Sequence, residues 1–94
     1  MADDKRPSQL TREPLMTLDV LPPDQTATIA AVEGETALTS RMRAMGLRVG
    51  REVMVVRRSR RGGPLQVRVG STDLIIRPRE ARLVRLRARP ADGR

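Results

Sequence analysis

Apolar and polar positions alternate over several short stretches of the chain, as is typical of β-strands. In the run LQVRV, Leu65, Val67 and Val69 share one face, while Gln66 and Arg68 share the other. Turn-forming glycine and proline residues separate this run from its neighbours. Comparable patterns predict further strands at about residues 26–32, 53–57, 73–77 and 82–87.

A different period appears between the first two of these strands. Leu38, Met42 and Met45 are spaced i, i+4 and i+7, which places them on one face of a helix that begins near residues 36–39. Hydroxyl side chains there are candidates to cap its first N–H groups. Gly46 follows where a helix needs a left-handed residue, and Leu47 is expected to fold back onto the last turn.

The remaining glycines predict tight reversals of the chain. Gly50 is expected to need a positive φ where the chain enters the next strand, and Gly70 marks another turn. The loop SRRGGP, with Gly63 and Pro64, reads as a hairpin connection. The segment PREA predicts a single helical or 3₁₀ turn. We therefore expect a mainly β fold: a small barrel of five to six strands, with one short helix inserted after the first strand and a 3₁₀ or helical turn before the last strand.

The two ends of the chain lack an apolar period. Residues 1–14 and 89–94 are predicted to be disordered, which leaves residues 15–88 as one candidate domain. The start of the chain offers no apolar stretch for a signal peptide. The aliphatic run from Val53 to Val56 is far too short for a membrane span, so no membrane insertion is expected.

Charge and composition restrict the function further. The net charge is +8, and it is divided unevenly: residues 1–40 carry −4, while residues 41–94 carry +12. An arginine-rich half of this kind suits nucleic acid, anionic lipid or an acidic protein partner. The chain has no Phe, Trp or Tyr, so it cannot stack bases on aromatic rings as the common RNA-binding modules do.

The chain also lacks the usual catalytic side chains. It contains no His, Cys or Tyr, and its carboxylates are scattered, so we expect no enzymatic activity and no cofactor. Met42 and Met45 at helical spacing are more typical of packing than of a metal site. A weak association of Fe(II) or another divalent metal with Glu33, Glu35, Asp73 or Glu80 stays open, although no defined metal site is identifiable.

Four arginines flank one loop. Arg57, Arg58, Arg60 and Arg61 could be simply solvated, could contact an acidic protein or a lipid, or could contact nucleic acid. The sequence leaves these three alternatives open, with nucleic acid the least favoured.

The stretch RMRAMGLRVGREVMVVRRSRRGGPLQVRV, followed by LIIRPREARLVRL, resembles the FeoA family over about residues 15–88. The resemblance rests on the order and spacing of several elements. They are Leu18 and Leu21, Met42 with Met45-Gly46-Leu47, Val49-Gly50, Gly63-Pro64, Ile76-Arg77 and Glu80-Ala81. The chain departs from the family pattern at Asp24, where relatives usually have glycine, and in the turn at residues 70–72.

The resemblance implies an SH3-like barrel in the cytoplasm that docks on the FeoB GTPase-transporter and supports ferrous iron uptake without catalysis. Within the sequence, the inserted helix has few polar breaks and is flanked by arginines, which favours it and its cap as the partner contact. We therefore expect the partner-binding residues to be Leu38, Arg41, Met42, Met45 and Leu47, together with the basic loop residues Arg57, Arg58, Arg60 and Arg61. The alternatives are an arginine-driven nucleic-acid-binding barrel, or a weak metal-binding module like the C-terminal domain of DtxR-like repressors. The oligomeric state and the direction of regulation stay open.

Overall fold

The computed structural model describes residues 15–59 and 62–88. The segments predicted to be disordered, 1–14 and 89–94, lie outside the described residues. The elements follow the chain in the order β1 (Leu15–Thr17), the 3₁₀ helix η1 (Leu18–Val20), β2 (Thr26–Val32), α2 (Thr36–Ala44), β3 (Glu52–Arg58), β4 (Leu65–Val69), β5 (Thr72–Ile76), α3 (Pro78–Ala81) and β6 (Val84–Ala88). None of the helices in these two ranges is long and apolar enough to cross a membrane.

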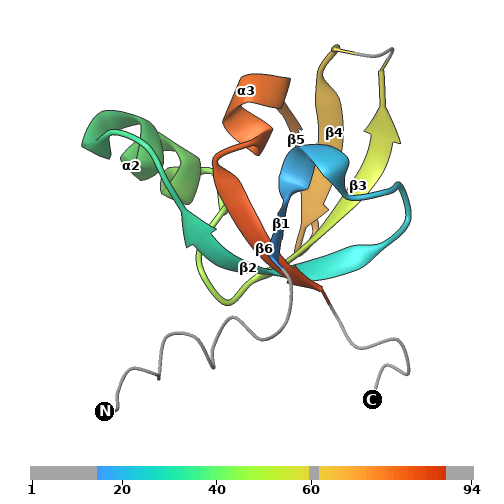
Figure 1. Cartoon of the computed structure of the whole chain (residues 1–94), viewed down its shortest axis with the longest axis horizontal. Helices are drawn as coiled ribbons and strands as arrows, with labels where there is room; N and C mark the ends of the chain where they lie inside the picture. Colours follow the sequence, from blue (N-terminus) through green and yellow to red (C-terminus); the bar gives the residue numbers. More distant parts are fainter. Residues whose placement is uncertain (1–14, 60–61, 89–94) are drawn as a thin grey trace.

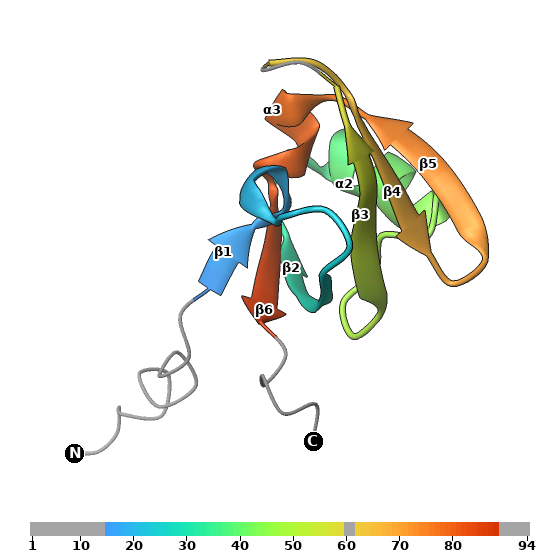
Figure 2. The same ribbon diagram turned by 90° about the vertical axis from the view of Figure 1, so that its right-hand side faces the viewer.

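All six strands belong to one antiparallel sheet with the order β1-β6-β2-β3-β4-β5. The sheet is strongly curved, and α3 lies over one end of it (Figures 1 and 2). The register shifts between Ile29 and Ala31, where β2 pairs with β6, and between Val55 and Arg57, where β3 pairs with β4. Such irregularities increase local twist and bend a strand, so they help a narrow sheet to curl around its own core.

The observed elements confirm the predicted mainly β architecture, with one difference in their order. The apolar residues before Pro22 form the short strand β1, which pairs with β6. The inserted helix α2 therefore follows the second strand instead of the first. A three-residue strand is stabilised by its pairing with β6 and not by a pattern of its own, which is why the sequence did not reveal it.

The core is entirely aliphatic. Leu65, Val67 and Val69 on β4 are buried, as their alternation predicts, and the intervening Gln66 and Arg68 face outward. The buried hydrophobic side chains of the described residues belong to Leu18, Leu21, Ala27, Ile29, Met42, Leu47, Val53, Val55, Leu65, Val67, Val69, Ile76, Ala81, Val84 and Leu86. Every strand from β2 to β6 contributes to this cluster, so the inner face of the curled sheet is continuous.

Helix α2 is held to this core by its C-terminal end. The N–H of Gly46 donates to the carbonyl of Arg43 at 3.0 Å, and the N–H of Leu47 donates to the carbonyl of Met42 at 3.0 Å. Gly46 has φ +112°. These are the two hydrogen bonds of a Schellman ending, and they bring the buried Leu47 back to the buried Met42. The predicted helix stop is confirmed.

The start of α2 differs from the expectation. The residue before the first turn is Glu35, and no side chain caps the helix there. The Thr39 hydroxyl donates instead to the carbonyl of Thr36 at 3.1 Å, because the hydroxyl groups lie inside the first turn and not ahead of it. Figure 1 shows α2 projecting to one side of the curled sheet.

The loop between η1 and β2 turns sharply against β3. Asp24 adopts φ +69° at the third position of a turn whose Gln25 N–H donates to the Pro22 carbonyl at 3.3 Å. A positive φ at this position, after a proline, is the geometry of a type II turn. The Asp24 N–H also donates to the Val55 carbonyl at 2.9 Å. Asp24 thus adopts a left-handed conformation that is uncommon for residues other than glycine.

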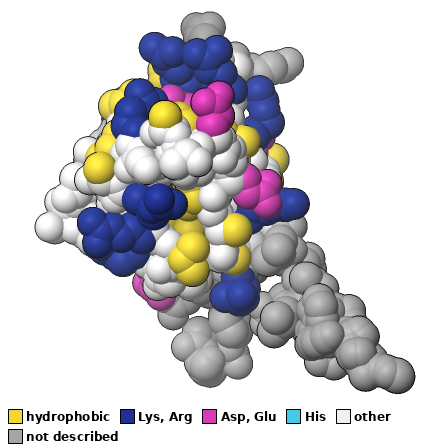
Figure 3. Space-filling model, turned by 90° about the vertical axis from the view of Figure 1, so that its left-hand side faces the viewer, with side chains coloured by type: hydrophobic (Ala, Val, Ile, Leu, Met, Phe, Trp, Pro, Cys, Tyr) yellow, Lys and Arg dark blue, Asp and Glu magenta, His cyan; other side chains and the backbone are white. Residues whose placement is uncertain are grey.

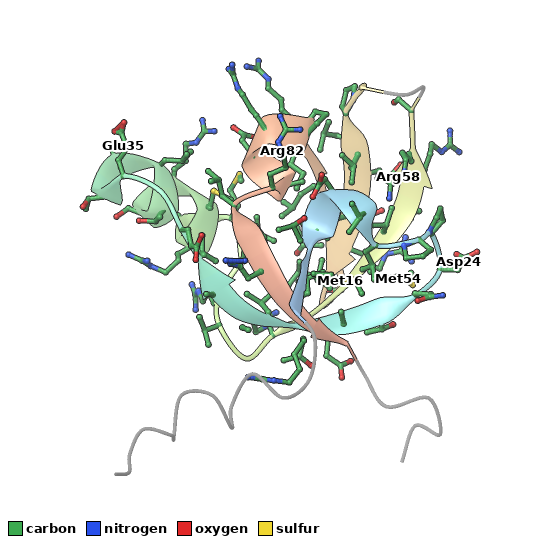
Figure 4. All side chains as sticks on the ribbon, viewed as in Figure 1. Met16, Asp24, Glu35, Met54, Arg58 and Arg82 are labelled. Carbon is green, nitrogen blue, oxygen red and sulfur yellow. The ribbon has the colours of Figure 1, made fainter. Side chains whose placement is uncertain are left out.

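Arg58 fixes the same loop from the end of β3. Its Nη1 donates to the Asp19 carbonyl at 2.6 Å, and its Nη2 donates to the Leu21 carbonyl at 2.5 Å. Figure 4 shows Arg58 on β3, on the same side of the molecule as Asp24. Two charge-assisted hydrogen bonds to backbone carbonyls orient this side chain toward the protein, so Arg58 has a structural role.

Replacement of Met42 tests the anchor of α2. Met42→Ala should lower the free energy of unfolding by about 2–5 kcal/mol, because it leaves a cavity in the aliphatic core. Urea denaturation measures the change. The exposed neighbour Arg43 provides the control, and Arg43→Ala should change stability by about 0.5 kcal/mol or less. Equal effects of the two substitutions would contradict a core position for Met42.

Replacement of Arg58 tests the loop contact. Arg58→Gln should destabilise the fold by about 1–3 kcal/mol, because two carbonyl groups lose their charged donor. Arg57→Gln removes the same charge from the adjacent exposed position and should be nearly neutral. Thermal unfolding of both variants at one pH provides the comparison, and a neutral Arg58→Gln would contradict the structural role.

Candidate functional site

Helix α2 and the short helix α3 enclose a shallow hollow on the molecular surface. Its volume is about 630 Å³, and it is lined by Glu35, Ala37, Leu38, Arg41, Arg77, Arg79, Glu80 and Leu83. A second hollow of about 530 Å³ adjoins it, lined by Arg41, Met45, Pro64, Ile75, Arg77 and Glu80. Because the two share Arg41, Arg77 and Glu80, we treat them as one surface and call it the α2–α3 surface.

Glu80 connects the two helices that form this surface. Its Oε2 accepts a hydrogen bond from Arg41 Nη2 at 2.6 Å, and its Oε1 accepts one from the backbone N–H of Arg77 at 3.1 Å. The hydrogen bond from the Arg77 N–H, and then that from the Arg41 guanidinium, lower the pKa of Glu80. A single carboxylate therefore both caps the first turn of α3 and ties α3 to α2.

The structure separates the expected contact residues on α2 into two groups. Leu38 and Met45 are half-buried, and Arg41 is exposed; all three line the α2–α3 surface. Met42 and Leu47 were expected to contact a partner, but both are fully buried. These two side chains fill the core beneath the end of the helix, so we do not include them in the docking surface.

The basic loop is divided as well. Arg57 is exposed, but Arg58 is half-buried and donates to the backbone of the loop after η1. Arg58 was expected to contact a partner, but two carbonyl groups of the protein itself accept hydrogen bonds from its guanidinium, so we do not include it in the docking surface. Arg60 and Arg61 lie outside the described residues.

The glycines expected at turns have the geometry of turns. Gly46, Gly50 and Gly70 have φ values of +112°, +93° and +64°. In the hairpin between β3 and β4 the positive φ, +80°, belongs to Gly62 and not to Gly63 or Pro64. Pro64 instead lines the α2–α3 surface next to Ile75.

Several residues of this surface were missed by the sequence analysis. Ile75 on β5 is 67% exposed, whereas its neighbour Ile76 is buried. Three consecutive apolar residues, Leu74 to Ile76, were the available signal, because successive side chains of a strand face opposite sides and one of the three must face outward. Arg79 lies in α3, and Arg77 and Leu83 flank it, far from α2 in sequence. No periodic pattern joins the two helices, so only the fold brings these residues together.

Three of the four carboxylates considered for a weak metal site are engaged with arginines, and the fourth, Glu35, lines the α2–α3 surface. Glu33 pairs with Arg85 at 3.1 Å, Asp73 with Arg68 at 2.7 Å and Glu80 with Arg41 at 2.6 Å. The hydrogen bonds from Arg68, and then from Gln66, lower the pKa of Asp73. Across residues 15–59 and 62–88, no group of three or more carboxylate, imidazole or thiolate side chains is placed to hold a metal ion.

The face of the molecule that carries α2 is mixed in character. Figure 3 shows basic side chains spread over this face with apolar side chains exposed between them. Such a surface suits recognition through charge and apolar contact.

The state of Glu80 predicts a dependence of stability on pH. Because folding lowers the pKa of this carboxylate from its ordinary value of 4.5, its contribution is present above that pH. The contribution is lost as the pH falls through the lower, folded-state value. Between about pH 5 and about pH 3, the wild type should therefore lose more stability than Glu80→Gln. Urea denaturation at both pH values gives the comparison, and parallel losses would contradict the role of Glu80.

Comparison with known proteins agrees with this architecture. The FeoA domain family matches residues 16–88. The crystal structure of Stenotrophomonas maltophilia FeoA in complex with zinc, described as a prokaryotic SH3 domain protein, is 33% identical; the match covers 83% of this chain and 93% of that one, with a TM-score of 0.67. The solution structure of iron(II) transport protein A from Clostridium thermocellum is 29% identical, covering 78% of this chain and 45% of that one, with a TM-score of 0.74.

A more distant similarity concerns the fold alone. A manganese-dependent transcriptional repressor has a TM-score of 0.73 at 16% identity, over 81% of this chain and 42% of the repressor. Among curated proteins, none matches the chain significantly.

These matches confirm the expected SH3-like fold. FeoA domains are non-catalytic, which also confirms the expectation that the chain is not an enzyme. Since the family match spans all the described elements except the first residue of β1, the chain belongs to the FeoA family of accessory proteins in ferrous iron transport.

Proposed function

We propose that this FeoA domain docks on the FeoB GTPase-transporter through the α2–α3 surface and thereby supports or regulates Fe(II) uptake. Membership of the family associates the chain with the FeoB system. The observation that carries the choice of surface is an exposed apolar side chain, Ile75, set beside arginines and two helices.

The apolar part of the surface is suited to burial against a partner. Ala37, Leu38 and Leu83 line one hollow, and Met45, Pro64 and Ile75 line the other. Covering the exposed side chain of Ile75 with a partner would remove apolar surface from water, which favours binding. Methionine and leucine adapt to the shape of a partner.

The charged part indicates the chemistry of the partner. Arg41 is already paired with Glu80, whereas Arg79 is exposed and has no ion pair within the described ranges. A partner segment with apolar residues at its centre and acidic residues at its edge would complement the surface. We therefore infer that FeoB contributes an acidic, apolar segment of its cytoplasmic part.

The structure weakens the case for the nucleic-acid alternative. That alternative rested on the basic tract around residues 57–61, and Arg58 of this tract donates to two carbonyl groups of the protein. Phosphate contacts need arginines that point toward solvent. The α2–α3 surface, with its apolar content, is better suited to a protein.

Replacement of Ile75 tests the docking surface. Ile75→Asp should weaken binding to the soluble GTPase part of FeoB about tenfold or more, because it places a carboxylate in an apolar contact opposite an acidic partner. Isothermal titration calorimetry with each guanine nucleotide measures the affinity. The fold should be retained, because this side chain faces solvent.

Val49 provides a matched control for this experiment. It is 65% exposed, close to the 67% of Ile75, and it lies in the turn before β3. Val49→Asp should bind as the wild type does. Equal losses in the two variants would contradict the assignment of the surface, and absence of wild-type binding at micromolar concentration with either nucleotide would contradict docking itself.

A further inference from the structure

A third hollow lies beside the α2–α3 surface, at the α3 end of the molecule. Its volume is about 460 Å³, and it is lined by Gly62, Pro64, Arg77, Pro78, Arg79 and Arg82. Three of these six residues are arginines, and none is acidic. Figure 4 shows Arg82 at this end of the molecule, away from Asp24 and Met54.

Two of the three arginines at this hollow have no carboxylate partner among the described residues. Arg41, Arg68 and Arg85, in contrast, each pair with a carboxylate. Arg79 and Arg82 are exposed and form no ion pair with a described residue. The charge of Arg77 lowers the pKa of Glu80, so part of its charge is already balanced.

Two uncompensated guanidinium groups at one hollow favour a ligand that carries phosphate. Guanidinium groups bind phosphate oxygens in a bidentate manner and are less strongly hydrated than ammonium groups. Placing like charges together is unfavourable in the free protein, and a bound anion relieves that repulsion. The hollow therefore fits a phosphate-containing anion.

We propose that Arg79 and Arg82, with Arg77 at their edge, bind the phosphate groups of anionic phospholipids and hold this end of the domain against a membrane surface. The chain has no aromatic side chain on which bases could stack, and the arginines surround one hollow and do not follow a long track. Both features favour headgroups over nucleic acid. The hollow shares Arg77 and Arg79 with the docking surface, so a domain docked on a membrane protein would present it near lipid.

Vesicle binding by the full chain tests the proposal without any transporter. The wild type should co-sediment with phosphatidylcholine vesicles that contain about 30 mol % phosphatidylglycerol at about 0.15 M salt, and not with pure phosphatidylcholine vesicles. Arg79→Gln/Arg82→Gln should weaken partitioning about 25-fold, or about fivefold for each charge that faces the surface. Arg77 is left in place because its charge also acts on Glu80, whose pKa it helps to lower.

A control variant removes the same charge elsewhere. Arg43 and Arg51 are exposed and line none of the walls of this hollow. Arg43→Gln/Arg51→Gln should weaken partitioning less than about threefold, because charges farther than about 8–10 Å from the lipid are screened at this salt concentration. Circular dichroism melting of both variants checks that the fold is retained.

Four outcomes would overturn the proposal. They are no binding of the wild type to the anionic vesicles, equal losses in the two double variants, binding of inorganic phosphate without binding of vesicles, and binding of an RNA oligonucleotide at the same salt concentration without binding of vesicles. The last two would assign the hollow to free anions or to nucleic acid. Docking on FeoB does not depend on any of these results, because no transporter is present.

Discussion

The absence of aromatic side chains constrains the whole structure. A core built from leucine, valine, isoleucine, methionine and alanine has no large aromatic side chains to fill its volume. A domain of this size also buries little surface area on folding. The sheet responds by curling until the inner faces of β2 to β6 meet around one cluster. Two register shifts and a left-handed Asp24 provide the bends that this curvature requires. Close packing of aliphatic side chains thus decides the shape of the molecule.

The same constraint explains why the surface of α2 is available for recognition. The helix contributes Met42 to the core, and the Schellman ending returns Leu47 to it. With its C-terminal end held in this way, the rest of α2 projects beside the sheet and leaves Leu38, Arg41 and Met45 at or near the surface. Glu80 then sets the position of α3 relative to α2. The buried side chains of Met42 and Leu47 and the carboxylate of Glu80 therefore shape the α2–α3 surface that we assign to docking.

Arginines have three different roles in this chain. Arg58 supports the backbone of a loop, Arg41 pairs with a carboxylate between two helices, and Arg79 and Arg82 face solvent without an ion pair in the described part of the chain. Composition alone counts all of these as positive charge. Among the described arginines, Arg79 and Arg82 place basic character that is open to partners at the α3 end of the molecule.

The sequence by itself determined the elements whose signals are local. Alternation in LQVRV determined β4, and the spacing of Leu38, Met42 and Met45, followed by Gly46, determined α2 and its end. The motif order also pointed to the FeoA family. Tertiary structure alone decided β1, whose three residues depend on pairing with β6, and the burial of Met42 and Leu47. It also decided the pairing of Arg41 with Glu80, 39 residues apart. The physical reason is that a periodic pattern reports which side of an element is apolar, whereas burial and ion pairing depend on which other element covers that side.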